Sequence, residues 1–424
     1  MKVLIVNTSE RTGGAAVAAG RLCDALNNNG VKARMLVRDK QSDNICVLTP
    51  RWPRLQKWHF LWERLRVLMH LHGGREHLFH IDIANSGIDI TRLQAFREAD
   101  VVHLHWVQQG MLSLRGIEKI LRSGKPVVWT MHDLWPASAI CHLSFSCHKY
   151  AAGCSNCPYL PGGGSANDLS ARAWRRKQRM LQAGTVNFVA CSRWLESEAK
   201  KSALLRNQHV TSIPNTIDTH VYCPGDKAAA RRAAHLPEQG RLLLFVCQRV
   251  TNSNKGMDYL VEACRILAQE HPEMTADTTL LLMGSHADEL TAAMPFRTVA
   301  LGYIDDEQQI VDIYRSADVF VLPSLSENLP NTIMEAMACG LPCVGFRVGG
   351  IPEEIDHRKN GYVAELRNSA DLAKGMLWVL SEADHDQLSK EAVRKVARQY
   401  SQSTVAVQYT ELYQHAIVER NLKI

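Results

Sequence analysis

Glu327 and Glu335 are the residues whose type and spacing most directly predict chemistry. Residues 319–322 predict a buried strand, and Glu327 lies in the loop that follows it. Glu335 lies one turn into a predicted helix over 332–339, which Gly340 ends. An ionised carboxylate only accepts hydrogen bonds, so one of these side chains suits sugar hydroxyls and the other a ribose diol. Taken alone, such a spacing more often reflects ordinary surface charge.

Two cations stand where predicted strands give way to helices. Arg249 follows a strand predicted over 242–247, and Lys255 precedes a helix predicted over 258–269. From the carboxyl ends of parallel strands such cations can reach a diphosphate, although many such residues are only surface charges. Fixed cations and helix N-termini can neutralise a departing phosphate without Mg²⁺, and no Asp-x-Asp metal motif is evident. We therefore expect no cofactor to be required for catalysis.

Histidines occupy the ends of two neighbouring predicted strands. His132 closes a strand predicted over 127–132, and this placement favours a functional site over the structural role that a lone histidine usually has. His103 and His105, near the end of the preceding strand, are compatible with packed or hydrogen-bonded core residues. No role is assigned to those two.

Glycines mark two further strand ends. Gly13 and Gly14 follow the first predicted strand, 2–7, and Gly302 with Tyr303 follows a later one. Glycine lets the backbone approach a ligand closely, but any tight turn can require it.

A longer pattern extends the carboxylate pair. Residues 327–340 read Glu-x7-Glu-Ala-Met-Ala-Cys-Gly, followed by Gly-Gly-Ile-Pro-Glu at 349–353 and Asn-Gly at 360–361. This highly specific run resembles the signature of the retaining glycosyltransferases of family four, which have the GT-B fold. The resemblance covers nearly the whole chain, from residue 13 to residue 361. It implies two Rossmann-like domains, a nucleotide-sugar donor and transfer with retention at the anomeric carbon.

The resemblance also implies roles for single residues. Arg249 and Lys255 match the family's phosphate-binding cations, which stabilise the departing diphosphate. Glu327 would hold the hydroxyls of the donor sugar, and Glu335 the ribose. His132 would lie beside the donor sugar, so His132 and Glu327 are the expected catalytic residues. Further substrate contacts are expected at Gly13, Gly14, Tyr303 and Asn331.

The loop after the first carboxylate departs from the family pattern. Many members have Gly-Phe-Gly there, where this chain has Asn328-Leu329-Pro330. Since proline has no backbone N–H, Pro330 cannot donate to the donor as the family's loop does. The resemblance does not define the donor contacts at this point.

Alternating strands and helices predict an α/β fold of two doubly wound, Rossmann-like domains facing a cleft, where the active site is expected. The first domain, 1–210, would bind the acceptor and the second, 211–400, the nucleotide-sugar, with a polar connector up to residue 240. A C-terminal helix within 401–424 would pack back on the first domain. Strands are predicted at 2–7, 31–38, 101–105, 127–132, 186–191, 242–247, 279–283, 298–301, 319–322 and 342–346.

Composition bounds the class of protein. With 424 residues, 46% hydrophobic and 22% charged, the chain is typical of globular enzymes and unlike disordered proteins. No export signal and no apolar run long enough to span a membrane is evident, which predicts a cytoplasmic protein. Residues 1–210 carry 29 Lys and Arg against 15 Asp and Glu, a net charge of +14, and the remainder carries −8. A basic half can attract anionic lipid, phosphorylated acceptors or nucleic acid, or simply be solvated.

Four of the twelve cysteines cluster within seventeen residues, at Cys141, Cys147, Cys154 and Cys157. Cys154 and Cys157 form a Cys-x2-Cys knuckle in a loop-rich stretch. Four thiolates can hold a structural zinc ion that would order the loop 137–165, and four unrelated reduced thiols are the alternative.

Aromatic and basic residues alternate from Trp52 through Trp58 to Trp62 at near-helical spacing. Such a helix can rest on an anionic membrane, and this suggests peripheral contact with its inner face. Packing of the tryptophans into the core of the first domain is the interpretation that we favour.

These observations predict a retaining, hexosyl-type glycosyltransferase that moves sugar from a nucleotide-sugar to a glycan or lipid-linked acceptor. Cell-surface polysaccharide assembly is the expected setting, and nucleic acid is not an expected partner. The rivals are another GT-B enzyme, such as a phosphorylase or epimerase, and a non-catalytic sugar-nucleotide-binding scaffold.

Overall fold

The computed structural model describes residues 1–50 and 53–422, which form two compact units. Unit 1 comprises Met1–Thr216 together with Val405–Ile424, and unit 2 comprises Ile217–Thr404. The chain therefore leaves unit 1 after residue 216 and returns to it for its last helix.

Unit 1 is built on a parallel sheet. Its strands are β1 (Lys2–Ser9), β2 (Lys32–Asp39), β3 (Val47–Leu48), β4 (Val101–Leu104), β5 (Val127–Met131), β6 (Asn187–Ala190) and β7 (His209–Ser212). Their order is β3-β2-β1-β4-β5-β6-β7. Val3 lies in register with Ala33 on one side and Val101 on the other, so β1 is central and flanked by parallel neighbours.

Helices cover both faces of this sheet. They are α1 (Gly14–Asn28), α2 (Pro53–His70), α3 (Gln94–Glu98), α4 (Leu114–Arg122), α5 (Leu169–Leu181), α6 (Arg193–Lys201) and α14 (Gln402–Asn421). Successive strand residues point to opposite faces. Val3 and Ile5 accordingly join a core with α1 and α14, whereas Leu4 and Val6 join a second core with α2, α4, α5 and α6.

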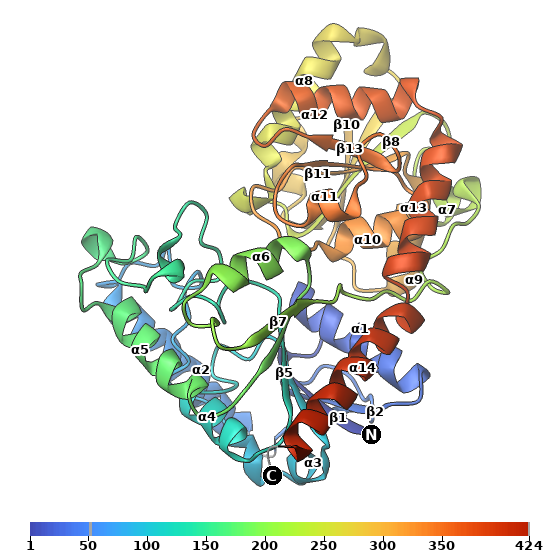
Figure 1. Ribbon diagram of the computed structural model, residues 1–424. Helices are drawn as coiled ribbons and strands as arrows, with labels where there is room; N and C mark the ends of the chain where they lie inside the picture. Colours follow the sequence, from blue (N-terminus) through green and yellow to red (C-terminus); the bar gives the residue numbers. More distant parts are fainter. Residues whose placement is uncertain (51–52, 423–424) are drawn as a thin grey trace. The chain divides into compact units, whose positions relative to one another are not determined.

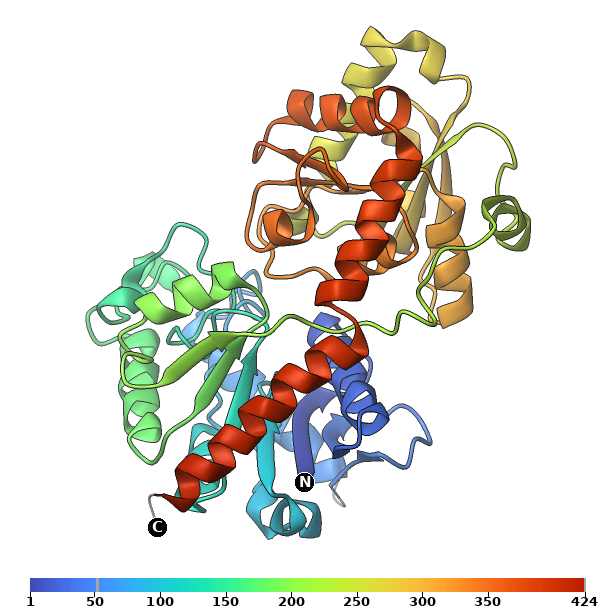
Figure 2. The same ribbon diagram turned by 45° about the vertical axis from the view of Figure 1, so that its right-hand side comes forward.

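The last helix completes one of these cores. Figures 1 and 2 show α14 lying along the sheet of unit 1 beside α1. The hydroxyl of Tyr413 lies 2.7 Å from Nδ1 of His103, and that of Tyr409 lies 2.9 Å from Oγ1 of Thr130. Side chains near the C-terminus thus hydrogen-bond to the central strands of the first unit.

Unit 2 contains a second parallel sheet. Its strands are β8 (Arg241–Arg249), β9 (Thr278–Ser285), β10 (Arg297–Gly302), β11 (Val319–Leu322), β12 (Cys343–Phe346) and β13 (Gly361–Ala364), in the order β10-β9-β8-β11-β12-β13. Its helices are α7 (Lys227–Ala233), α8 (Met257–Glu270), α9 (Glu307–Ser316), α10 (Asn331–Ala338), α11 (Ile351–Glu354), α12 (Ser369–Leu377) and α13 (His385–Gln399), with a π-helical turn at Trp378–Glu382. The predicted α/β architecture with two Rossmann-like sheets is confirmed.

The stretch predicted as a polar connector is in large part a folded piece of unit 2. Helix α7 forms within it, capped by Asp226, whose carboxylate accepts the N–H of Ala229 at 3.0 Å. Arg231 of α7 is buried and donates to Asp318 just before β11, at 2.8 Å. The prediction of a connector was wrong here because the many Arg and Ala residues form a short packed helix and not a linker.

Candidate functional site

The strand order of unit 2 identifies where a ligand would bind. The chain runs outward from β8 to β9 and β10, then returns to the other side of β8 at β11. In parallel α/β sheets, ligands bind beyond the carboxyl ends of the two strands at which the order reverses. Arg249 ends β8, and Glu327 lies in the loop after β11, so both flank this switch point.

Lys255 and Glu327 form an ion pair at this switch point. Lys255 ends a short 3-10 turn after β8 and donates from Nζ to Oε1 of Glu327, which also accepts the hydroxyl of Ser324 at 3.0 Å. The two charged side chains are 25% and 14% exposed, so both are partly withdrawn from water. The structure thus brings together one residue predicted to bind phosphate and one predicted to bind sugar.

Two glycines fix the loop that carries Glu327. Gly256 has φ of +71°, and a Cβ atom there would lie 1.8 Å from the carbonyl oxygen of Pro323. Gly349 has φ of +56°, and its Cβ atom would lie 1.7 Å from the carbonyl oxygen of Glu327. Both the left-handed backbone and the close approach require glycine. Any other residue at either position would therefore force the backbone on that side of the Glu327 loop to move.

Hydrogen bonds complete this attachment. The side-chain amide of Asn254 donates to the carbonyl of Ser326 at 2.8 Å, and the N–H of Leu325 donates to the carbonyl of Asn254 at the same distance. On the other side the N–H of Gly350 donates to the carbonyl of Asn328 at 2.7 Å. The loop that carries Glu327 is accordingly positioned through contacts to its main chain, while the carboxylate itself is held by Lys255 and Ser324.

The second carboxylate has a different environment. Glu335 is buried in α10, and its Oε2 accepts the hydroxyl of buried Tyr314 at 2.8 Å. Tyr314 was not predicted as a site residue, because nothing in its spacing to Glu335 marks the pair. Asn331 is the first residue of α10, directly after Pro330 at the N-cap.

The remaining predicted residues of unit 2 lie at the surface. Arg249 is exposed, and its Nε donates to the hydroxyl of Thr251 at 2.8 Å. Tyr303, after β10, is 64% exposed. Their assigned ligand contacts stay predictions.

In unit 1 the strand order reverses between β1 and β4. Gly13 and Gly14 begin α1 directly beyond β1, as predicted for a loop near a ligand. His132 follows β5, and its Nε2 lies 2.9 Å from Nδ1 of His105. Its Nδ1 lies 3.5 Å from Sγ of Cys191, so both ring nitrogens have protein partners. The catalytic role expected of His132 stays a prediction.

Burial keeps these histidines neutral. It lowers the pKa of His103 to about 3 and that of His132 to about 4, and it holds the pKa of His105 well below its ordinary value. His103 and His105, which received no role from the sequence, are buried beneath the strand ends. The strand ends of unit 1 thus carry uncharged rings, whereas the switch point of unit 2 carries an ion pair.

A charged network behind His132 was not predicted. His142 lies with Nδ1 2.7 Å from Asp133 and Nε2 2.6 Å from Asp82. Burial opposes a charge on the ring, but the two carboxylates outweigh it and raise the pKa of His142 to about 10. Arg64 donates to the other oxygen of Asp82, and Trp106 donates to Asp133 at 3.0 Å. His142 is therefore a cation that fixes the residue next to His132.

The aromatic helix α2 does not pack as favoured from the sequence. Val67 is fully buried, but Trp58 is 69% exposed and Trp62 is 50% exposed. The interpretation of core packing was wrong for these two, because the face of α2 that packs inward carries the buried polar residues Gln56, Glu63 and Arg64 beside Val67. Trp52 lies outside the described residues. The outward face, which we call the α2 apolar ridge, consists of Leu55, Trp58, Leu61, Trp62, Leu65 and Met69.

The cysteines are free thiols throughout the described chain. In that part, no three His, Cys, Asp or Glu side chains are already arranged to hold a metal ion. The thiols of Cys141, Cys147, Cys154 and Cys157 nevertheless line one common cavity.

Models of known protein families match both halves of the chain. Residues 12–221 match the model of Glycosyltransferase Family 4, and residues 240–382 match that of Glycosyl transferases group 1. The chain is 25% identical to N-acetyl-alpha-D-glucosaminyl L-malate synthase of Bacillus anthracis over 49% of its own length, and spans about half (54%) of that relative. It is 26% identical to D-inositol 3-phosphate glycosyltransferase of Thermobispora bispora, over 75% of this chain and 71% of that protein.

Solved structures share the fold over nearly the full length. Sucrose-phosphate synthase of Thermosynechococcus elongatus has a TM-score of 0.70 at 18% identity, covering 99% of this chain and 100% of that one. HepE of Anabaena, solved with UDP and glucose, has a TM-score of 0.63 at 16% identity, covering 98% and 100%. Together with the two family matches, these likenesses show that the chain belongs to the group 1, family four glycosyltransferases of the GT-B fold.

Proposed function

We propose that the protein transfers a sugar from a nucleoside diphosphate sugar to an acceptor hydroxyl, with retention at the anomeric carbon. The observation that carries this proposal is the Lys255–Glu327 ion pair at the strand switch point of unit 2. A cation suited to phosphate lies there against a carboxylate suited to sugar hydroxyls.

The ion pair suggests how the donor would bind. In the free protein each charge neutralises the other. A donor would exchange these contacts: its diphosphate would take the ammonium of Lys255, and its sugar hydroxyls would donate to Glu327. Arg249 at the end of β8 would add a second cation, and Glu335 would accept hydroxyls of the ribose. Donor binding would thus replace the ion pair between Lys255 and Glu327 with two contacts to the donor, one to its diphosphate and one to its sugar.

Transfer would then proceed on one face of the sugar. The bond between the anomeric carbon and the diphosphate oxygen breaks, and a bond to the acceptor oxygen forms on the same face. The acceptor proton passes to the leaving phosphate oxygen, so no protein nucleophile is required. Lys255 and Arg249 would stabilise the charge that develops on the diphosphate. His132, from unit 1, is proposed to lie beside the donor sugar.

Uridine diphosphate is the first donor nucleotide to test, because the related HepE was solved with UDP and with UDP-glucose. A ligand that binds only the folded state raises the melting temperature by mass action. We expect a larger shift from one nucleoside diphosphate class than from the others in a panel of UDP, GDP and ADP, and loss of the shift in Lys255→Ala.

The matched control is Lys374→Ala, which removes an exposed lysine from α12 of the same unit. Equal shifts in wild type, Lys255→Ala and the control would contradict the phosphate assignment. Product analysis with and without added acceptor separates the rivals: an epimerase turns over without acceptor, a phosphorylase needs phosphate, and a scaffold forms no product.

We further propose that the acceptor is lipid-linked and that the α2 apolar ridge contacts the membrane at its inner face. Residues 55, 58, 62, 65 and 69 recur every three to four positions, so they share one face of the helix. Trp58 and Trp62 expose aromatic rings of the kind that partition to the bilayer interface. No helix in the described part of the chain is long and apolar enough to cross a membrane.

Cations accompany the ridge. Lys57 and Arg66 fall at opposite edges of the apolar face at 3.6 residues per turn of α2. An apolar helix face with flanking cations is complementary to a bilayer that contains anionic lipid. Cell-surface polysaccharide assembly remains the proposed setting.

Vesicle flotation tests this contact. We expect the wild type to float with vesicles containing phosphatidylglycerol, less with pure phosphatidylcholine, and less again as salt is raised. Trp58→Ala with Trp62→Ala should reduce the floated fraction several-fold, whereas Ile45→Ala, which removes an exposed apolar side chain elsewhere in unit 1, should not. Flotation that is equal for all three proteins would contradict the membrane contact.

A further inference from the structure

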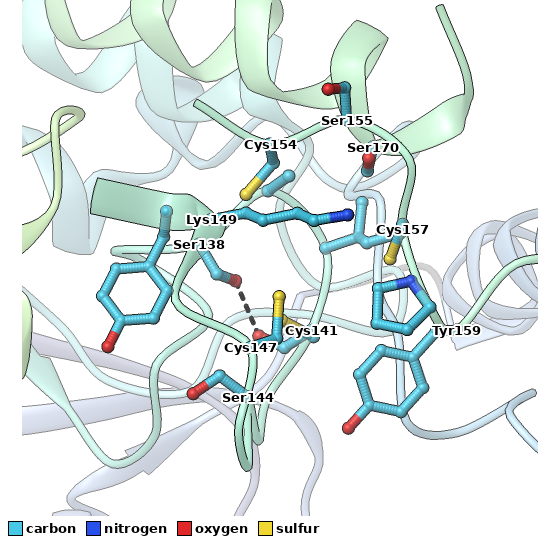
Figure 3. A pocket seen from close by; sticks show the side chains of 14 residues that line it. Ser138, Cys141, Ser144, Cys147, Lys149, Cys154, Ser155, Cys157, Tyr159 and Ser170 are labelled. Carbon is cyan, nitrogen blue, oxygen red and sulfur yellow. Dashed lines mark hydrogen bonds between the residues drawn. The ribbon is translucent and has the colours of Figure 1, made fainter. Parts of the chain in front are cut away.

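The loop between β5 and α5 contains a cluster of thiols that the transfer reaction does not use. In this part of the chain the structure has only short 3-10 turns, at Lys149–Ala151 and Pro161–Gly163. Cys141, Cys147, Cys154 and Cys157 all line a single cavity of about 20 Å³ within it. Figure 3 shows these four residues placed around that cavity, with Cys141 and Cys147 on one side and Cys154 and Cys157 on the other. We propose that these four thiols bind one zinc ion.

The size of the cavity suits a single ion. About 10–15 Å³ is enough for one water-sized guest, and the cavity offers about 20 Å³. Zinc binds four thiolates in a tetrahedron at about 2.3 Å, which places the sulfurs about 3.8 Å from one another. In the described chain the four sulfurs do not converge to this tetrahedron. Binding therefore requires their side chains to turn into the shared cavity.

The backbone around Cys154 and Cys157 suits chelation by two residues of one turn. Asn156 between them has φ of +48°, the left-handed conformation that bends the chain back sharply. The N–H of Cys157 donates to Oδ2 of Asp168 at 2.9 Å, and the same carboxylate caps α5 by accepting the N–H of Ala171. The knuckle is thus already tied to the first turn of α5.

The thiols form the donor set because His142 is engaged elsewhere and His148 does not line the cavity. Both ring nitrogens of His142 lie against carboxylates, those of Asp133 and Asp82. Four thiolates around Zn²⁺ leave a net charge of −2. Lys177 of α5 is buried beside the cluster and donates to the carbonyl oxygen of Ser138, a residue of the cavity lining, at 3.0 Å. Lys149, whose side chain also lines the cavity, would offset part of that negative charge.

Such an ion would link three parts of unit 1. Cys141 precedes His142, whose ring fixes Asp133 beside His132. Cys147 lies farther along the loop, and the Cys154–Cys157 knuckle is tied to α5. One ion would therefore join the strand-end network to the helix behind it.

Metal analysis of the full-length protein tests the proposal. We expect about one zinc per chain in protein purified without chelator, as for a closed four-thiolate site. Cys154→Ser with Cys157→Ser should contain less than about a tenth of that amount, since two of the four ligands are lost. Cys46→Ser, which removes a half-buried thiol outside the cluster, should keep its zinc.

A second measurement covers the case in which the double variant does not fold. Wild-type protein loaded with Co²⁺ should show the visible absorption bands of tetrahedral cobalt and the thiolate charge-transfer bands. Addition of Zn²⁺ should then remove both. Wild type that lacks zinc with four titratable thiols in the cluster, a disulfide among these four cysteines, or a double variant that keeps its zinc would each overturn the assignment.

Discussion

The two strand switch points of this glycosyltransferase differ in the charge and the burial of their polar side chains. In unit 2, Lys255 and Glu327 carry full charges, are partly exposed, and neutralise one another. In unit 1, His103 and His105 are buried and His132 is half-buried; all three rings are uncharged, and hydrogen bonds hold them in place. Charged and partly exposed groups thus mark the switch point of unit 2, whereas uncharged and largely buried rings mark the strand ends of unit 1.

The difference also concerns what holds each group in position. Glu327 depends on main chain, through the close approach of Gly256 and Gly349 to its loop. His132 depends on side chains, namely the ring of His105 and the thiol of Cys191. Substitutions in the two regions should therefore have different consequences: loss of activity in unit 2, and loss of stability or a change in its pH dependence in unit 1.

The largest effect is expected from Glu327→Gln. The amide keeps the shape of the side chain but removes the charge that would accept sugar hydroxyls and pair with Lys255. We expect kcat to fall about 100-fold or more, with a small change in melting temperature. Donor turnover and thermal unfolding, measured side by side with exposed Glu382→Gln as control, check this. A variant within threefold of wild type would break the contrast between the units.

Glu354 is a residue of unit 2 that should affect stability and its pH dependence, as we expect for residues of unit 1. Neither of its carboxylate oxygens has a hydrogen-bond partner in the described structure, and burial raises its pKa well above the ordinary value. Glu354 therefore does not reduce the free energy of unfolding below its unfolded-state pKa near 4.3. As pH rises from there towards the folded-state pKa, the free energy of unfolding falls by about 1.4 kcal/mol per pH unit.

Glu354→Leu should remove this loss. We expect the variant to gain stability over wild type at pH 8 and to gain less at pH 5, in urea unfolding followed by circular dichroism. Glu382→Leu, at an exposed position, should show no such difference. An equal change at both pH values would mean that Glu354 does not titrate as inferred.

For the neutral histidines of unit 1 we expect the opposite pH dependence, with stability lost as pH falls. Burial, and to a lesser extent the electrostatic interaction with His132, lowers the pKa of His103 to about 3. Its contribution to stability is complete above the unfolded-state pKa near 6.5 and is lost as pH falls, by about 2 kcal/mol between pH 6.5 and pH 5. Tryptophan fluorescence reports on unit 1, because eight of the nine tryptophans precede residue 216. His103→Gln should flatten this pH dependence, and exposed His209→Gln should leave it unchanged.

The smallest effect is expected from Tyr413→Phe, which removes a single hydroxyl from α14. Its hydrogen bond to Nδ1 of His103 is lost, which should cost about 1–2 kcal/mol because the ring nitrogen stays buried. Urea unfolding followed by tryptophan fluorescence measures this. Tyr303→Phe, at an exposed position in unit 2, is the control. No change in Tyr413→Phe would show that packing alone holds the last helix.

Most of the fold could be predicted because buried parallel strands are short, continuous apolar runs. The strand 319–322 was predicted to the residue, and the others lie within two residues of their predicted ends. The strands β3 (Val47–Leu48), β7 (His209–Ser212) and β13 (Gly361–Ala364) were missed, since β3 has only two residues, β7 is polar and half-exposed, and β13 begins with glycine. Helix α2 was misjudged because its apolar face was expected to be the buried one, whereas the face that packs inward contains the charged residues Glu63 and Arg64.

Less of the site could be predicted from the sequence. The family pattern indicated Lys255 and Glu327, but not that they pair, because contact across 72 residues depends on the strand order. The carboxylates around His142 were missed for the same reason: Asp82 lies 60 residues away in sequence. Neighbouring residues at one strand end are readable from the sequence, whereas partners from different strands are not.

The return of the chain to unit 1 has a consequence for its synthesis. Residues 405–413 supply part of the core beneath β1 and β4, so unit 1 cannot close this core until the ribosome has made all of unit 2. At about 5–20 residues per second, the intervening residues 217–404 take roughly 10–40 s. Throughout that interval the face later covered by Tyr409 and Tyr413 is open. The nascent chain is therefore most vulnerable to aggregation, and most in need of a chaperone, well after its first 216 residues have emerged.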